Sequence, residues 1–112
     1  MAETPSNAQI WNRAFWIGEI RPEVLKESME SHLDEAGFSR LGFTEHHFSP
    51  RGYTALWLLG ESHLALHTFP ENERSYVELS SCNLTMLERF ASLCESYFKV
   101  VPHISIPQPE PS

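Results

Sequence analysis

Two segments with helical periodicity enclose a long stretch of strand-like sequence, and this order limits the folds open to the chain. Residues 23–36 carry apolar side chains at helical spacing. Pro22 suits the first turn of this helix, Gly37 is expected to end it, and Asn83 can cap a second helix through its side-chain oxygen. The stripes expected to face the core are Leu25, Met29, Leu33 and Ala36 in the first helix, and Leu84, Leu87, Phe90 or Ala91, Cys94 and Phe98 in the second.

Strand-forming segments precede, separate and follow the two helices. Residues 53–59 are a short apolar run typical of a buried strand, and the next strand follows after only Gly60 and Glu61. Residues 38–48 are mixed in character, and residues 49–52 form a turn. The strands expected are residues 14–20, 53–59, 62–69, 75–79 and 100–106. The predicted fold class is α+β, a two-layer sandwich in which two helices cover one face of a mostly antiparallel sheet.

Length and charge restrict the number of domains and the partners. A chain of 112 residues, 41% of them apolar, fits a single domain spanning residues 1–112. The net charge of −7 disfavours nucleic acid and anionic membrane surfaces as partners. Since no apolar run is long enough to span a bilayer and the first residues lack the layout of a secretory signal, a cytoplasmic location is expected. Polar or proline-rich tails are expected at residues 1–8 and 107–112.

The two cysteines, Cys82 and Cys94, lie in or beside the second predicted helix. Their number and placement do not indicate a disulfide framework. Cys94 falls on the apolar stripe of that helix, so it is expected to be a small buried side chain. Cys82 lies outside the stripe.

The segment richest in chemically active side chains is residues 60–71, GESHLALHTFPE, followed by Cys82 after one short strand. It resembles the ESH-x-x-x-HT-[aromatic]-PE signature of the small prokaryotic S-adenosylmethionine decarboxylases, and Cys82 falls at that family's distance from His67. The similarity is strong from about residue 46 to 83 and architectural elsewhere. It implies an enzyme, a carboxy-lyase of polyamine biosynthesis that converts S-adenosylmethionine to decarboxylated S-adenosylmethionine.

The same resemblance implies that the chain makes its own cofactor. The Ser62 hydroxyl attacks the preceding carbonyl, an N-to-O acyl shift gives an ester, and elimination cuts the chain between Glu61 and Ser62. The products are residues 1–61 and residues 62–112, with Ser62 converted to a pyruvoyl group. In this family the pyruvoyl ketone forms a Schiff base with the substrate amine and accepts electrons as carbon dioxide leaves.

Three more residues receive catalytic roles from the resemblance. Cys82 is the acid that protonates carbon after carbon dioxide leaves, with a structural cysteine beside a helix as the alternative. His67 moves the proton during self-cleavage, with an ordinary structural histidine as the alternative. Thr54 stands where the family usually has a serine that assists processing, and it keeps the hydroxyl.

For the substrate, Phe48 and Phe69 match the aromatic residues that sandwich the adenine, and Glu71 matches the carboxylate that receives the ribose hydroxyls. Aromatic faces also attract the positive sulfonium, although phenylalanines near a strand end are core residues in most proteins. The sequence departs from the family here, because Phe69 replaces a common tryptophan and Ser80 replaces an aromatic residue. Asn83 replaces a usual glycine.

These departures leave two other functions open. One is a family offshoot that decarboxylates arginine or ornithine, with an acidic residue holding the distal cation. The other is a non-enzymatic metal-binding or regulatory homologue, in which histidines and Cys82 hold zinc, although the spacing lacks the usual paired ligands. The histidines in question are His46, His47, His63 and His67. The family resemblance itself implies no metal, and it implies a homodimer of cleaved protomers whose sheets face one another, with active sites near the interface.

Overall fold

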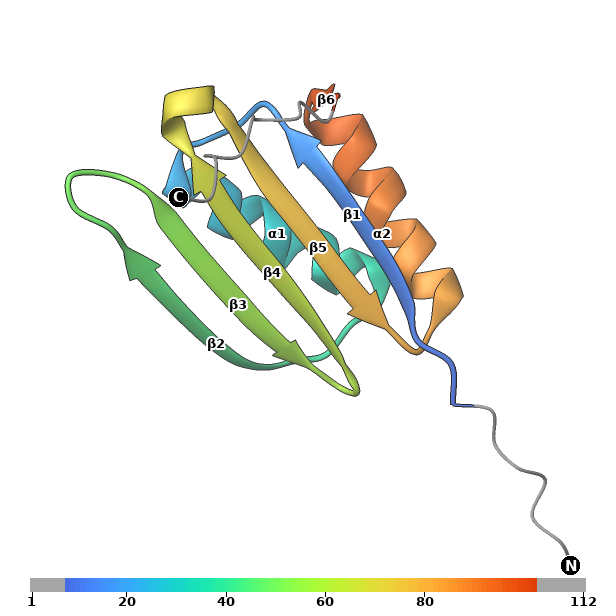
Figure 1. Ribbon diagram of the computed structural model, residues 1–112. Coiled ribbons are helices and arrows are strands. Elements are labelled where there is room, and N and C mark those ends of the chain that lie inside the picture. The colour runs from blue at the N-terminus through green and yellow to red at the C-terminus, as the bar shows by residue number, and fades with distance from the viewer. Residues whose placement is uncertain (1–7, 103–112) are drawn as a thin grey trace, which may run out of the picture.

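The computed structural model describes residues 8–102. Its elements are, in chain order, β1 (Trp11–Ile17), α1 (Pro22–Ala36), β2 (Arg40–His47), β3 (Tyr53–Leu59), β4 (Ser62–Phe69), the 3-10 helix η1 (Pro70–Asn72), β5 (Arg74–Ser81), α2 (Leu84–Tyr97) and β6 (Val100–Val101). Six strands form one antiparallel sheet in the order β2-β3-β4-β5-β1-β6. Both helices lie behind it in Figure 1, which confirms the predicted α+β sandwich.

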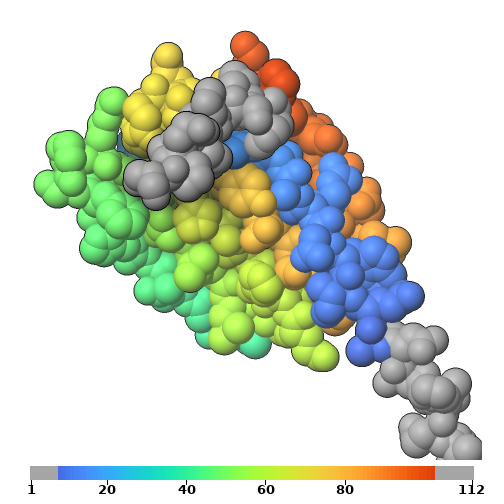
Figure 2. Space-filling model, viewed as in Figure 1, coloured from blue at the N-terminus to red at the C-terminus, as the bar shows by residue number. Residues whose placement is uncertain are grey.

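The core lies between the sheet and the two helices. Alternate residues of β3, from Tyr53 to Leu59, are buried, because successive side chains of a strand point to opposite faces. They pack with the buried faces of β4 and β5 against the predicted stripes of α1 and α2. Leu84 is an exception, because this first residue of α2 was expected in the stripe but is exposed. The other face of the sheet, called the open face below, has no helix over it, and Figure 2 looks onto it with β2, β3 and β4 in green.

The two ends of α1 and the start of α2 lie where the sequence predicts. Pro22 is the first residue of α1, and Gly37 ends the helix with φ 101° in the left-handed region that glycine adopts without a steric penalty. The side chain of Asn83 accepts a hydrogen bond from the amide of Met86 at 3.0 Å, which caps α2. The predicted bounds of β3 and β4 are also confirmed.

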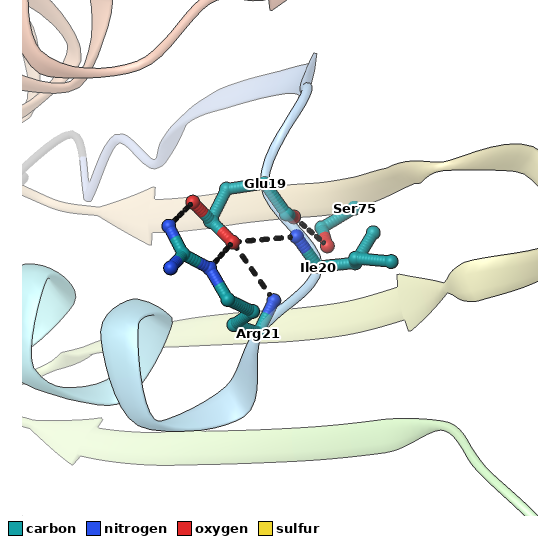
Figure 3. A network of polar contacts seen from close by, with 4 residues as sticks. All are labelled: Glu19, Ile20, Arg21 and Ser75. Atoms are coloured by element: carbon teal, nitrogen blue, oxygen red, sulfur yellow. Dashed lines mark hydrogen bonds and ion pairs between the residues drawn. The ribbon is translucent and has the colours of Figure 1, made fainter.

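The prediction for the first strand is wrong at both ends. Residues 14–20 were expected, but β1 is Trp11–Ile17, and the chain leaves the sheet before Glu19 (Figure 3). The Glu19 carboxylate accepts hydrogen bonds from the amides of Ile20 and Arg21 and from the Arg21 guanidinium. Those amides are therefore unavailable to a neighbouring strand. The Arg21 contacts lower the pKa of Glu19 to about 2.

Three other strand predictions need correction or fall partly outside the described residues. The mixed segment 38–48 contains strand β2, an edge strand whose side chains are almost all exposed. The strand expected at 75–79 extends over Arg74–Ser81. The last strand is Val100–Val101 in the described part, and residues 103–106 of the prediction lie outside it. The expected tails lie outside the described residues, apart from Ala8.

Candidate active site

The turn between β3 and β4 has an unusual backbone. Leu59 pairs with Ser62, so Gly60 and Glu61 alone make the connection. The left-handed conformation falls on Glu61, with φ 54°, and not on the neighbouring glycine. A residue with a Cβ in this region costs on the order of 1 kcal/mol or more. Backbone strain therefore lies in the residue whose carbonyl forms the peptide bond to Ser62.

Ser62 begins β4 and points toward the helices, with only 7% of its surface exposed. Its hydroxyl donates a hydrogen bond to Ser81 Oγ at 3.1 Å, at the end of the neighbouring strand β5. Ser81 Oγ also accepts a hydrogen bond from the amide of Asn83 at 2.9 Å. The sequence did not single out Ser81, although alternation along β5 places it on the buried face with Val77 and Leu79.

Cys82 lines the same pocket as Ser62. It follows β5 directly, is exposed, and lines a pocket of about 200 Å³ together with Ser62, Ser81 and Asn83. Gly60 of the β3–β4 turn also lines this pocket, and Figure 1 shows that turn at the lower end of the sheet. The structure therefore places the proposed nucleophile and the proposed proton donor in one hollow near the start of α2.

His67 and Thr54 form a second group on the open face. Thr54 Oγ1 and His67 Nδ1 are 2.9 Å apart, and the two residues are cross-strand partners in β3 and β4. The ring of Tyr76 stacks on His67 with 6.5 Å between centroids. Five positions separate Ser62 from His67 along β4, so their side chains point to opposite faces and lie roughly 16 Å apart along the strand. One chain does not bring these two side chains together.

The residues matched to substrate binding lie at the other end of the sheet. Phe48 is half exposed, and its ring meets the His46 ring edge to face with 4.5 Å between the ring centroids. It lines a pocket of about 410 Å³ with Thr68 and Pro70. Glu71 is exposed in η1, next to this pocket in sequence. Phe69 packs instead on Trp16, with 5.5 Å between ring centroids. The structure therefore gives the two phenylalanines different aromatic neighbours.

An aromatic cluster on the open face was not predicted. Trp16 contacts both Phe69 and Tyr76, with 5.2 Å between the Trp16 and Tyr76 centroids. The Tyr76 hydroxyl donates to Glu78 at 3.1 Å. β1 and β5 are antiparallel neighbours, and their register places Trp16 opposite Tyr76. The pattern within any one segment does not indicate this cluster, because its members come from three strands.

The other site predictions concern metals, thiols and membranes. Within residues 8–102, no three His, Cys, Asp or Glu side chains come close enough together to hold a metal ion. Cys82 and Cys94 are both free, and burial raises the pKa of the Cys94 thiol to about 12. Cys94 is thus a buried core side chain, as predicted. No helix in the described part of the chain has the length and apolar character needed to cross a membrane.

The chain resembles proteins named as S-adenosylmethionine decarboxylase proenzymes. The one of Prochlorococcus marinus (strain MIT 9313) is 39% identical over 70 residues, which are 62% of this chain and 56% of the relative. The one of Synechococcus sp. (strain WH7803) is 32% identical over 80 residues, 70% of this chain and 62% of the relative. For Archaeoglobus fulgidus the identity is 31% over 65 residues, 58% of each chain. The chain thus spans a little more than half the length of these curated relatives.

A solved structure and a family model complete the comparison. The crystal structure of the adenosylmethionine decarboxylase from Aquifex aeolicus has a TM-score of 0.67 and 19% identity, and the match covers 92% of this chain and 96% of that one. This likeness supports the fold. The family model described as S-adenosylmethionine decarboxylase matches residues 20–104, which include every candidate site residue from Phe48 to Cys82. The chain therefore belongs to the S-adenosylmethionine decarboxylase family.

Proposed function

We propose that this chain is a self-cleaving, pyruvoyl-dependent decarboxylase that acts on S-adenosylmethionine. The observation that carries the proposal is the arrangement at the β3–β4 turn, where the Ser62 hydroxyl follows the left-handed Glu61 and shares a pocket with Cys82. Family membership and the names of the relatives support the same activity. The mature enzyme would consist of residues 1–61 and 62–112.

The cleavage needs only groups of this chain and one water. The Ser62 oxygen attacks the Glu61 carbonyl carbon, the C–N bond breaks, and the amide nitrogen takes the hydroxyl proton, which leaves an ester. His67, supplied by a second copy of the chain, then takes the proton from the Ser62 Cα, the Glu61 carboxylate leaves, and residue 62 becomes a dehydroalanine. Water replaces the nitrogen of its imine tautomer, and ammonia is released. Strain at Glu61 favours the first step, because opening the peptide bond relieves it.

The residues around Ser62 fit the group that this reaction produces. The pyruvoyl group supplies a ketone that holds an amine and withdraws electrons when carbon dioxide leaves. The pocket beside residue 62 is partly polar and holds the exposed Cys82 thiol. Cys82 can therefore deliver a proton to the substrate carbon within this pocket.

A second copy of the chain would complete the site. His67 and Thr54 lie on the open face, roughly 16 Å along β4 from Ser62. Two copies whose open faces meet end for end would bring the His67 end of one chain over the β3–β4 turn of the other, where the backbone of Ser62 begins β4. Leu56 and Leu58 support this contact, because 43% and 58% of their surfaces are exposed on that face. The proposed enzyme is thus a homodimer.

The pocket beside Phe48 favours S-adenosylmethionine over arginine or ornithine. Arg21, Arg51 and His47 line it, and none of its described lining residues is acidic. A basic amino acid would need an acidic partner for its distal cation, and none of the described lining residues supplies one. All the relatives reported above are named for S-adenosylmethionine.

The proposal is tested on freshly purified protein. Mass spectrometry should find residues 1–61 and a fragment 62–112 with a blocked, ketone-bearing first residue, whereas Ser62→Ala should stay intact. Released carbon dioxide is then measured with S-adenosylmethionine, arginine and ornithine as separate substrates. An intact wild-type chain without any ketone-capped fragment overturns the proposal, and turnover of arginine or ornithine alone overturns the substrate.

A further inference from the structure

The hydroxyl of Ser62 is held by the side chain of Ser81, which takes no part in the proposed bond-making and bond-breaking steps. It donates to Ser81 Oγ at 3.1 Å. Both side chains are buried, and Ser81 has no exposed surface. A hydroxyl on a short side chain otherwise rotates freely to suit its surroundings. This contact therefore sets where the hydrogen and the lone pairs of the Ser62 oxygen point.

Ser81 is itself fixed by the backbone that follows it. Its oxygen accepts a second hydrogen bond from the amide of Asn83 at 2.9 Å, and its own hydroxyl lies 3.4 Å from the Asn83 carbonyl oxygen. Asn83 is the residue that caps α2. The chain of contacts Ser62–Ser81–Asn83 thus joins the first residue of β4 to the start of a helix.

We infer that Ser81 is a positioning residue for self-cleavage, an inference that rests on the proposed function. By accepting the hydrogen of Ser62, Ser81 directs that hydrogen toward β5 and leaves the oxygen's lone pairs free for the Glu61 carbonyl carbon. Ser81 does not gain a proton in the reaction, because the hydroxyl hydrogen ends on the amide nitrogen. His67 does not replace it within one chain, because its side chain is on the opposite face of β4.

A purely structural role for Ser81 makes different predictions. Its contact with Asn83 also stabilises the turn into α2, so losing the hydroxyl lowers stability in either case. Only the positioning role slows the attack step at temperatures where the variant is fully folded. Misplacing a reacting atom by about 1 Å can cost roughly a hundredfold in rate.

The experiment compares Ser81→Ala with Ser75→Ala, in which another fully buried serine of β5 loses its hydroxyl. Purified precursors are incubated well below their melting temperatures, and the first-order cleavage constant is followed by mass spectrometry. We expect Ser81→Ala to cleave roughly ten to a hundred times more slowly than wild type. Ser75→Ala should cleave at nearly the wild-type rate. Ser81→Thr keeps the hydroxyl and should recover most of the rate.

Hydroxylamine identifies the affected step, because it cuts an ester but leaves the amide intact. Ser81→Ala should not accumulate ester, so hydroxylamine should not speed its cleavage. Equal rates for Ser81→Ala and wild type overturn the inference, as does rapid cleavage of Ser81→Ala by hydroxylamine. Should Ser81→Ala not fold, Ser81→Cys, with a weakly accepting sulfur, takes its place and should also be slow. A wild-type chain that never cleaves overturns the proposed function instead.

Discussion

Thr54 Oγ1 and His67 Nδ1 lie 2.9 Å apart across β3 and β4, on the face of the sheet away from the Ser62 hydroxyl. The contact fixes one nitrogen of the imidazole and so determines which nitrogen is left to handle a proton. The two residues therefore act as a unit, and Thr54 orients the ring of His67.

Replacing Thr54 by Val keeps the shape of the side chain but removes this contact. We expect the cleavage constant to fall roughly tenfold, less than the ~100-fold or greater loss expected when a proton-transfer group is removed outright. Ester should accumulate, because in the proposed mechanism His67 acts at the elimination and not at the initial attack. Thr54→Ser is the control and should stay near the wild-type rate; a Thr54→Val chain that matches wild type would contradict the role.

Glycine at position 61 should relieve the strain in the β3–β4 turn. Glu61 has φ 54°, which costs a residue with a Cβ about 1 kcal/mol relative to glycine. In a Ser62→Ala background, which cannot cleave, Glu61→Gly should be more stable than Glu61→Ala by about 1 kcal/mol in urea denaturation. With Ser62 present, the glycine variant should cleave roughly five times more slowly. Equal stability of the two variants would show that the turn holds no usable strain.

The fold was predictable where local pattern and tertiary environment agree. In β3, alternate burial from Tyr53 to Leu59 follows one core face, and Asn83 carries its own capping oxygen. β2 gave no such pattern, because an edge strand with most of its side chains in solvent does not alternate. The end of β1 depends on the Glu19 carboxylate, which accepts hydrogen bonds from the next two backbone amides. The periodicity of apolar residues does not reveal such a contact.

The candidate site was predictable in its residue types but not in its geometry. The family motif assigns Ser62 and Cys82 to the proposed reaction, and their shared pocket comes from the register of β4 and β5. Ser81 carries no motif, and its contact with Ser62 depends on that register. Ser62 and His67 are an odd number of residues apart, which places their side chains on opposite faces of a regular strand. That conclusion requires residues 62–69 to be one unbroken strand, as the structure shows.

His32 should make the precursor less stable in mild acid. It is buried beside Tyr97 and Phe98, and its Nε2 has no hydrogen-bond partner in the described structure. Burial lowers the pKa of His32 below the ordinary 6.5, while the nearby Glu35 opposes the shift. Because the unfolded chain binds the proton more readily, stability should be full above about pH 6.5 and should fall as the pH drops below it.

The measurement is the urea midpoint of the Ser62→Ala precursor between pH 8 and pH 5. The midpoint should fall toward pH 5, and His32→Phe, which keeps an aromatic ring without a titrating group, should lose that part of the fall. An unchanged pH dependence in His32→Phe would mean that the lost stability comes from other groups.

A charge on the open face should separate the proposed dimer. Leu58 is 58% exposed there, and Leu58→Glu would bury a carboxylate against the facing sheet. Sedimentation should show a dimer for the wild type and a monomer for the variant. Cleavage should slow with the loss of the dimer, because His67 would no longer reach a partner's Ser62. As a control, Ala8→Glu adds the same charge at an exposed position before β1 and should stay dimeric. A monomeric wild type that cleaves normally would contradict the shared site.

Mixed dimers test directly whether His67 of one chain acts on Ser62 of the other. A Ser62→Ala chain has nothing to cleave but keeps His67, and a His67→Ala chain keeps Ser62 but lacks the imidazole. Neither should yield fragments alone. When they are co-expressed, His67 of the first chain should act on residue 62 of the second, because within one chain the two residues lie roughly 16 Å apart along β4. Mass spectrometry should then find residues 1–61 released from the His67→Ala chain.

Co-expression with a Ser62→Ala/His67→Ala chain is the control and should release none. If His67→Ala stays intact beside Ser62→Ala while the wild type cleaves, His67 acts within its own chain, and β4 must leave the sheet for it to do so.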